Sequence, residues 1–99
     1  MRSRYTAYVQ GAVYYVIATT AAASRGGLDA EELRAYCSGL RGVSLAVLAT
    51  LAGGPGDEAG EVRFAATLRL HGRKFVQREH SRFVREAGRW VYVDGDPLP

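Results

Sequence analysis

The last third of the chain, residues 73–95, alternates between two kinds of side chain. Over residues 74–84 the odd positions are aromatic, acidic or neutral polar residues, and the even positions are basic residues and valines. Residues 85–89 contain a glycine and interrupt this pattern, which resumes over residues 90–95. Because successive side chains of a strand point to opposite faces, an alternation broken by such a turn predicts a β-hairpin.

Two further strands are expected before this hairpin. The clearest alternation in the chain spans residues 61–70, and His71-Gly72 predicts a two-residue turn that leads into the hairpin. Residues 43–51 have β-type patterning, and the glycine-rich residues 53–60 predict a mobile hairpin loop. One face of the earlier strand is expected to hold Val43, Leu45, Val47, Ala49 and Leu51.

The N-terminal part of the chain has helical spacing. Residues 2–10 and 13–20 place apolar side chains at helical intervals, and Gly11 separates the two segments. Residues 21–27 are small and flexible and predict a loop.

A third helix is predicted after this loop. Asp29 resembles an N-cap, and Leu33, Tyr36 and Cys37 form the apolar stripe that follows it. Three helices followed by four antiparallel strands predict an α+β fold, with the helices packed on one face of the sheet. The 99 residues are expected to form a single domain.

Pairing the strands through turns at His71-Gly72 and Ala87-Gly88 predicts which side chains share a face. This register places Ser81 opposite Val62 on one side and opposite Asp94 on the other. The inner face, which is assigned to the helices, then holds Val62, Phe64, Leu68, Phe75, Gln77, Glu79, Ser81, Phe83, Trp90, Tyr92 and Asp94. The outer face holds Arg63, Arg69, Lys74, Val76, Arg78, His80, Arg82, Val84, Arg89, Val91 and Val93.

The composition of the chain argues against disulfides, cysteine-built metal sites and membrane-spanning segments. The single cysteine, Cys37, permits no intrachain disulfide and no cysteine-built metal site, so we expect no metal. No apolar run is long enough to span a membrane, and the N-terminus lacks a signal-peptide core, so we expect a cytoplasmic protein. The formal net charge of +3 is too small to require a nucleic-acid partner.

Two blocks of sequence resemble a known family. The first block is residues 1–8, and the second comprises Glu79, residues 81–85 and residues 88–95. Together they resemble the YchJ-like family of uncharacterised bacterial proteins, whose main domain is similar to nuclear transport factor 2. The resemblance implies a cone-like fold in which a curved antiparallel sheet wraps over the helices.

The resemblance implies no cofactor for this chain. Family members usually carry a cysteine-rich SEC-C zinc motif before the arginine-rich start, and often another after the domain. No such motif occurs in residues 1–99, so its zinc site is not expected here. The family commonly has His-Glu-Arg-Ser where this chain has Arg78-Glu79-His80-Ser81, so no histidine role is carried over.

Cone-like folds of this type commonly keep a pocket between the helices and the sheet. Glu79 and Asp94 are the candidate catalytic pair, since burial and mutual repulsion would raise the pKa of one of the two carboxyl groups, as a general acid or base near neutral pH requires. The favoured interpretation is purely structural, namely a buried ion pair between these carboxylates and Arg2 or Arg4, and a ligand or catalytic pocket is second. The expected ligand-binding residues are Tyr5, Tyr8, Gln77, Ser81, Phe83, Trp90 and Tyr92.

The basic outer face allows three interpretations. The first is a solvated surface, and the second is a docking surface for another copy of the chain or a protein partner. Nucleic acid is third, because no aromatic side chains alternate with the arginines to stack on bases.

We expect a non-catalytic binding or accessory module of the YchJ-like family, and its candidate partners are a small-molecule ligand in the cone and a second copy or protein partner on the outer face. One alternative is an enzyme of the hydrolase, isomerase or dehydratase type that uses Glu79 and Asp94. A second alternative is a nucleic-acid-associated module that uses the outer face.

Overall fold

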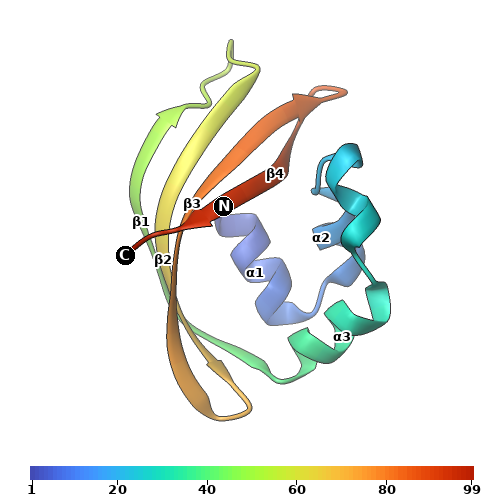
Figure 1. Ribbon diagram of the computed structural model, residues 1–99, viewed down its shortest axis with the longest axis vertical. Helices are drawn as coiled ribbons and strands as arrows, with labels where there is room; N and C mark the ends of the chain where they lie inside the picture. Colours follow the sequence, from blue (N-terminus) through green and yellow to red (C-terminus); the bar gives the residue numbers. More distant parts are fainter.

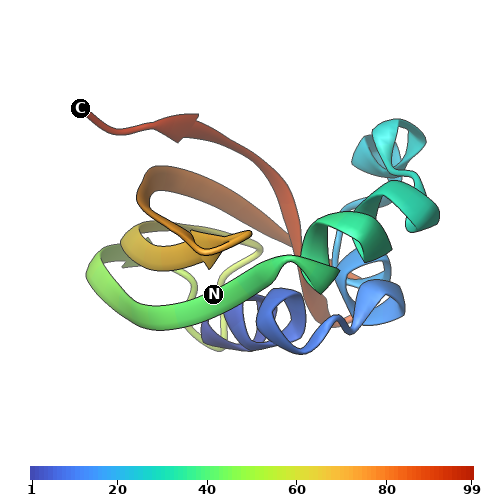
Figure 2. The same ribbon diagram turned by 90° about the horizontal axis from the view of Figure 1, so that it is seen from below.

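The computed structural model describes residues 1–99 and has the predicted α+β order. A four-stranded antiparallel sheet in the order β1-β2-β3-β4 curves around the helices, which all lie on its concave side (Figure 1 and Figure 2). No helix is long and apolar enough to cross a membrane. The elements are α1 (Arg2–Gln10), α2 (Val13–Ala18), the 3-10 helix η1 (Ala22–Gly27), α3 (Ala30–Ser38), β1 (Leu40–Ala52), β2 (Ala59–Leu70), β3 (Arg73–Glu86) and β4 (Arg89–Pro97).

Local sequence signals set the end of α1 and the start of α3 as expected, whereas the helix predicted over residues 13–20 ends earlier, at Ala18. Gly11 ends α1 in the left-handed conformation, with a φ of 71°. The Asp29 carboxylate caps α3 by accepting hydrogen bonds from the backbone N–H groups of Glu31 at 2.8 Å and Glu32 at 3.3 Å. The predicted loop over residues 21–27 is wrong in part, because residues 22–27 form η1.

Both predicted two-residue turns are confirmed. His71 and Gly72 have φ values of 50° and 82°, and Ala87 and Gly88 have values of 50° and 77°. Two successive residues with positive φ are typical of type I′ turns, whose twist matches the strands that they join. The first turn gives the predicted register between β2 and β3, in which Val62 lies opposite Ser81.

The predicted register between β3 and β4 is wrong beyond Tyr92. Phe83 lies opposite Tyr92 as expected, but the next pair is Arg82 with Asp94, so Val93 is an extra residue on β4. Such a β-bulge reverses the faces of the residues that follow it. Asp94 therefore shares the outer face with Arg82, and Ser81 lies opposite Gly95.

The prediction that five alternate residues of β1 share one face is also wrong. The strand begins at Leu40, and register shifts between Gly42 and Ser44 and between Val47 and Ala49 divide it. Leu45 and Val47 pair with inward residues of β2. The other three members of the predicted face, Val43, Ala49 and Leu51, are exposed to solvent.

The core lies where β2 meets the helices. Phe64, Ala66 and Leu68 of β2 and Leu40 of β1 are all at most 5% exposed, and Tyr5 and Tyr8 of α1 pack against them. The inward phase of β2 predicted from its alternation is thus confirmed. Burial of this apolar surface is the main force that holds the helices on the sheet.

The residues that follow α2 pair with the free edge of β4 at a single residue, Tyr92. The backbone of Tyr92 donates to the Thr19 carbonyl and accepts from the Ala21 N–H, with both N–O distances at 2.7 Å. Thr20 and Tyr92 form an isolated parallel bridge. The C-terminal end of α2 is therefore fixed directly beside Tyr92.

We predict that Ala87→Asn stabilises the protein. Ala87 is an exposed residue held at a φ of 50°, a region where asparagine is better tolerated and is favoured in type I′ turns. The expected gain is about 1 kcal/mol, which corresponds to a rise of about 4–8 °C in the thermal unfolding midpoint. Ala87→Val is the control and should lower the midpoint. An unchanged or lower midpoint for Ala87→Asn would contradict the assigned turn.

Candidate functional site

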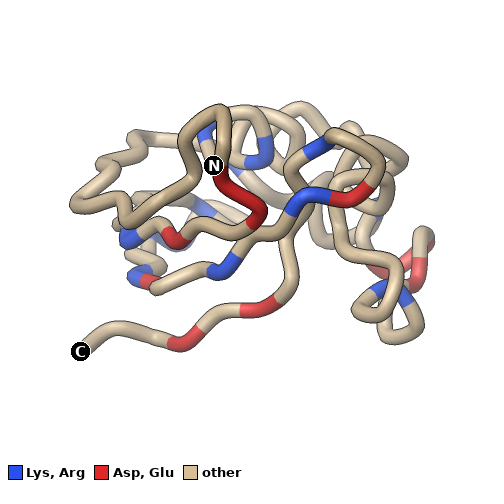
Figure 3. The backbone as a smooth tube through the Cα atoms, turned by 90° about the horizontal axis from the view of Figure 1, so that it is seen from above, with Lys and Arg blue, Asp and Glu red and all other residues tan.

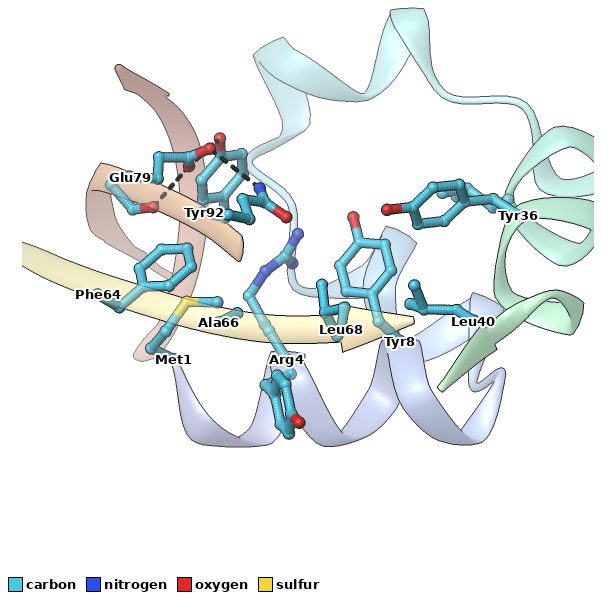
Figure 4. Close-up of a pocket in the computed structure, with 14 residues that line it drawn as sticks. Met1, Arg4, Tyr8, Tyr36, Leu40, Phe64, Ala66, Leu68, Glu79 and Tyr92 are labelled. Carbon is cyan, nitrogen blue, oxygen red and sulfur yellow. Dashed lines mark hydrogen bonds between the residues drawn. The ribbon is translucent and has the colours of Figure 1, made fainter. Parts of the chain in front are cut away.

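A cavity of about 300 Å³ lies between the helices and the concave face of the sheet. Figure 4 shows it bounded by α1, by Tyr36 of α3 and by residues of the sheet. Most of its wall is apolar, and its polar groups come from different elements of the fold. The lining residues are Met1, Arg4, Tyr5, Tyr8, Leu33, Tyr36, Leu40, Phe64, Ala66, Leu68, Gln77, Glu79, Ser81 and Tyr92.

Arg4 is the buried basic residue of this wall and is only 6% exposed. Its Nη1 donates to the Thr19 hydroxyl at 2.7 Å, to the Val16 carbonyl at 3.2 Å and to the Thr20 hydroxyl at 3.5 Å. The two hydroxyls in turn donate to carbonyls of α2, that of Thr19 to Tyr15 and that of Thr20 to Val16. Arg4 therefore joins α1 to the C-terminal end of α2.

No carboxylate forms an ion pair with Arg4. The predicted pairing of Arg2 or Arg4 with Glu79 or Asp94 is not formed. Burial lowers the pKa of the Arg4 guanidinium, although arginine keeps its charge at any physiological pH. The carbonyl-rich end of α2 and the rings of Tyr92 and Tyr8, whose centroids lie 4.8 and 5.9 Å from the guanidinium carbon, supply partial negative charge instead.

Glu79 is the carboxylate of the cavity. Its Oε1 accepts hydrogen bonds from the Ser81 hydroxyl at 2.7 Å and the Tyr92 hydroxyl at 3.1 Å, and its Oε2 accepts a longer one of 3.4 Å from Gln77 Nε2. Gly95 on β4 makes room for this side chain, since a Cβ at that position would overlap three of its atoms. The three donors and the glycine fix the orientation of the carboxylate.

The tyrosine hydroxyls of the cavity have raised pKa values. Burial and the neighbouring Glu79 carboxylate raise the pKa of Tyr92 to about 12. Burial also raises the pKa of Tyr8 and of Tyr36, whose rings meet edge to face with centroids 6.4 Å apart. All three hydroxyls therefore keep their protons near neutral pH. That of Tyr92 donates to Glu79, whereas those of Tyr8 and Tyr36 can donate hydrogen bonds into the cavity.

The structure brings most of the expected ligand-binding residues together. Tyr5, Tyr8, Gln77, Ser81 and Tyr92 line the cavity with Glu79. Phe83 and Trp90 line a separate cavity of about 530 Å³, which shares Met1 and Arg4 with the first. Sequence reasoning missed Tyr36 and the lining role of Arg4, although the helical spacing of Tyr36 with Leu33 was a usable signal.

Asp94 does not reach the cavity. The bulge at Val93 turns it outward, where its Oδ1 accepts from Arg82 Nε at 2.6 Å. Asp96 accepts from Nη1 of the same guanidinium at 2.8 Å, and this bond holds the pKa of Asp96 below its usual value. Glu79 and Asp94 thus lie on opposite faces of the sheet and do not form the expected acid–base pair.

The outer face carries both signs of charge. Figure 3 shows acidic positions interspersed with basic ones, two of them near the C-terminus. Arg82 is paired with two aspartates, and His80 Nε2 lies 2.6 Å from a Glu61 carboxylate oxygen. Docking of a protein partner, a second copy or nucleic acid on this face stays a prediction.

No cluster of three or more histidine, cysteine or acidic side chains is arranged to hold a metal ion. Cys37 is a free, buried residue, and burial raises the pKa of its thiol. The site therefore offers hydrogen bonds, one buried cation and one carboxylate rather than metal ligands.

A curved antiparallel sheet wrapped over three helices, with a cavity between them, defines the cone-like class of domains similar to nuclear transport factor 2. A family model described as "YchJ, middle NTF2-like domain" matches residues 1–95. The chain belongs to this YchJ-like family, as its two sequence blocks predicted.

Named relatives agree with this assignment. A UPF0225 protein of Geobacter sulfurreducens is 35% identical over 95 residues, which cover 96% of this chain and 59% of that protein. A UPF0225 protein of Pectobacterium carotovorum is 43% identical over 102 residues, which cover 96% of this chain and 63% of that protein. The chain thus spans about three-fifths of the length of these relatives.

Two solved structures share the fold. The solution structure of RPA3114, a SEC-C motif containing protein from Rhodopseudomonas palustris, matches with a TM-score of 0.86 and 31% identity over all of this chain and 76% of that one. The crystal structure of a SEC-C motif containing protein from Psychrobacter arcticus matches with a TM-score of 0.78 and 23% identity over all of this chain and 59% of that one. The second likeness shows the fold alone.

We predict that Glu79→Gln lowers the pKa of Tyr92. The substitution removes the negative charge beside the phenol but leaves its burial, so the pKa should fall from about 12 part of the way to its usual value of 10.0. A pH titration of the Tyr92 ring by NMR measures this change. Glu61→Gln on the outer face is the matched control and should leave the titration unchanged.

The raised pKa of Tyr92 also sets how the stability of the folded protein changes with pH. Unfolded Tyr92 ionises near pH 10.0, whereas folded Tyr92 keeps its proton until about pH 12. Its contribution to stability is therefore complete below pH 10.0 and is lost as the pH rises to about 12. A Glu79→Gln variant in which the pKa of Tyr92 stays the same or rises would contradict the contact between the two groups.

Proposed function

We propose that the chain is a non-catalytic module of the YchJ-like family that binds a small molecule in the cavity between the helices and the sheet. The observation that carries this proposal is the cavity itself, whose wall combines apolar side chains with Arg4, Glu79 and four tyrosines. Apolar pockets with a few convergent polar groups are the usual form of small-molecule sites.

Arg4 and Glu79, the two charged side chains of the cavity, do not form an ion pair with each other. Arg4 bonds to the end of α2 and Glu79 bonds to its strand neighbours, so neither group neutralises the other. Because buried charges are normally paired, two opposite charges that line the same space without bonding to each other leave both groups available to a ligand.

An enzyme that uses Glu79 and Asp94 is not supported by this geometry. The two carboxylates lie on opposite faces of β3 and β4, and Asp94 is bonded to Arg82. Glu79 remains as one carboxylate without a second carboxyl group beside it. A binding role is therefore favoured over acid–base catalysis.

We predict that Ala66→Leu abolishes small-molecule binding. Ala66 lies on the cavity wall, and three added carbon atoms would occupy the space left for a ligand. Backbone amide shifts of residues 64–68 and 77–81, followed by NMR during titration with a panel of acidic, basic and neutral metabolite-sized compounds, should identify binders to the native chain. The variant should lose them.

Ala65→Leu is the matched control for this test. Ala65 is adjacent in sequence, but strand alternation directs it to the outer face, opposite Arg78. It should bind as the native chain does. A native chain whose cavity amides do not shift with any compound, or an Ala66→Leu variant that binds unchanged, would overturn the proposal.

A further inference from the structure

The strongest unexplained feature of the cavity is the charge of Arg4. The side chain is 94% buried, yet all three of its hydrogen bonds come from one nitrogen, Nη1. No fully buried polar side-chain atom lacks a partner, so the two guanidinium nitrogens that make none of these bonds keep accessible surface. Arg4 lines both this cavity and the second one, and the Tyr8 hydroxyl also interacts with its guanidinium. Figure 4 shows the guanidinium directed between Tyr8 on one side and Tyr92 with Glu79 on the other.

A buried guanidinium with free donors favours an anionic ligand group. Transfer of a charge into an apolar interior is unfavourable unless the charge is paired, and no carboxylate of the chain pairs with this one. The planar fork of arginine matches a carboxylate or phosphate oxygen pair, and such charge-assisted bonds are among the strongest in proteins.

The Glu79 carboxylate restricts the charge of the anion that the cavity can bind. Its negative charge lines the same cavity and disfavours a ligand with a double negative charge, such as a phosphate monoester. A carboxylate has about four acceptor positions, and the chain fills three of them from Gln77, Ser81 and Tyr92. The remaining position suits a donor on the ligand, either an ammonium or a hydroxyl group.

The apolar part of the cavity wall limits the size and the polarity of the ligand group that fits beside it. Phe64, Ala66 and Leu68 of β2 and Leu40 of β1 are apolar and nearly fully buried, with Leu33 and Tyr36 of α3 completing that side. The volume of about 300 Å³ is at the lower end of the usual range for ligand pockets. The space therefore fits a compact apolar or aromatic group rather than a nucleotide.

We propose that the cavity binds a small organic carboxylate with an apolar body, with its carboxylate on Arg4 and a donor group on Glu79. This inference rests on the proposed function, because it requires the cavity to be a ligand site. It adds the chemical class of the ligand, namely amino or hydroxy acids with an apolar side chain.

Five probes with similar aromatic bodies test this class on the native chain. They are 3-phenylpropionate, its neutral amide, phenylalanine, phenethylamine and phenyl phosphate. The amide shifts of residues 64–68 and 77–81 give the dissociation constant of each probe. We expect 3-phenylpropionate to bind at least about tenfold more tightly than its neutral amide, and phenylalanine to bind more tightly still.

Two variants assign the two ends of the ligand. Arg4→Met should remove the preference for the carboxylate over the amide, with Arg63→Met on the outer face as the control that keeps it. Glu79→Gln should keep that preference but remove the advantage of phenylalanine over 3-phenylpropionate. If Arg4→Met does not fold, the comparison of probes on the native chain still decides the proposal.

The failures of the two proposals are distinguishable. Equal binding of the carboxylate and its amide in the cavity, or tighter binding of phenethylamine or phenyl phosphate than of the carboxylate, would overturn the ligand class while the binding function stands. Absence of cavity shifts with all five probes and with the wider panel would overturn both.

Discussion

The anchoring of Arg4 is the constraint on which the arrangement of the helices depends. One guanidinium nitrogen bonds to two hydroxyls and a carbonyl at the end of α2, and the same end of α2 pairs with Tyr92 at the edge of the sheet. The charge is accommodated by carbonyl dipoles and aromatic faces rather than by a carboxylate. This arrangement leaves Glu79 without a basic partner and leaves the space between the two groups open.

The β-bulge at Val93 is the second constraint, because it places Asp94 on the outer face of the sheet while Glu79 stays on the inner face. Without the extra residue, Asp94 would follow Ser81 into the cavity and add a second negative charge beside Glu79. With it, Asp94 and Asp96 pair with Arg82 outside, and Gly95 gives the Glu79 side chain room to lie across β4. The cavity therefore keeps one cation and one anion.

Sequence patterns predicted the parts of the fold that depend on neighbouring residues. The turn residues His71-Gly72 and Ala87-Gly88 fixed the hairpins, and alternation fixed the inward phase of Phe64 and Ser81. The bulges in β1 and at Val93 were not predictable, because an added residue leaves the alternation on each side intact. The partners of Arg4 were missed for another reason: they lie 12 to 16 residues away in sequence, and threonines at a helix end carry no specific signal.

The most direct measurement of the central claim is a crystal structure at a resolution that shows ordered solvent in the cavity. We expect the Arg4 guanidinium to bond to Thr19 on one side and to an ordered water or a bound anion on the cavity side. Glu79 should remain on Ser81 and Tyr92. A carboxylate of Glu79 bonded directly to Arg4, with side chains filling the space, would contradict an unpaired buried cation and with it the ligand site.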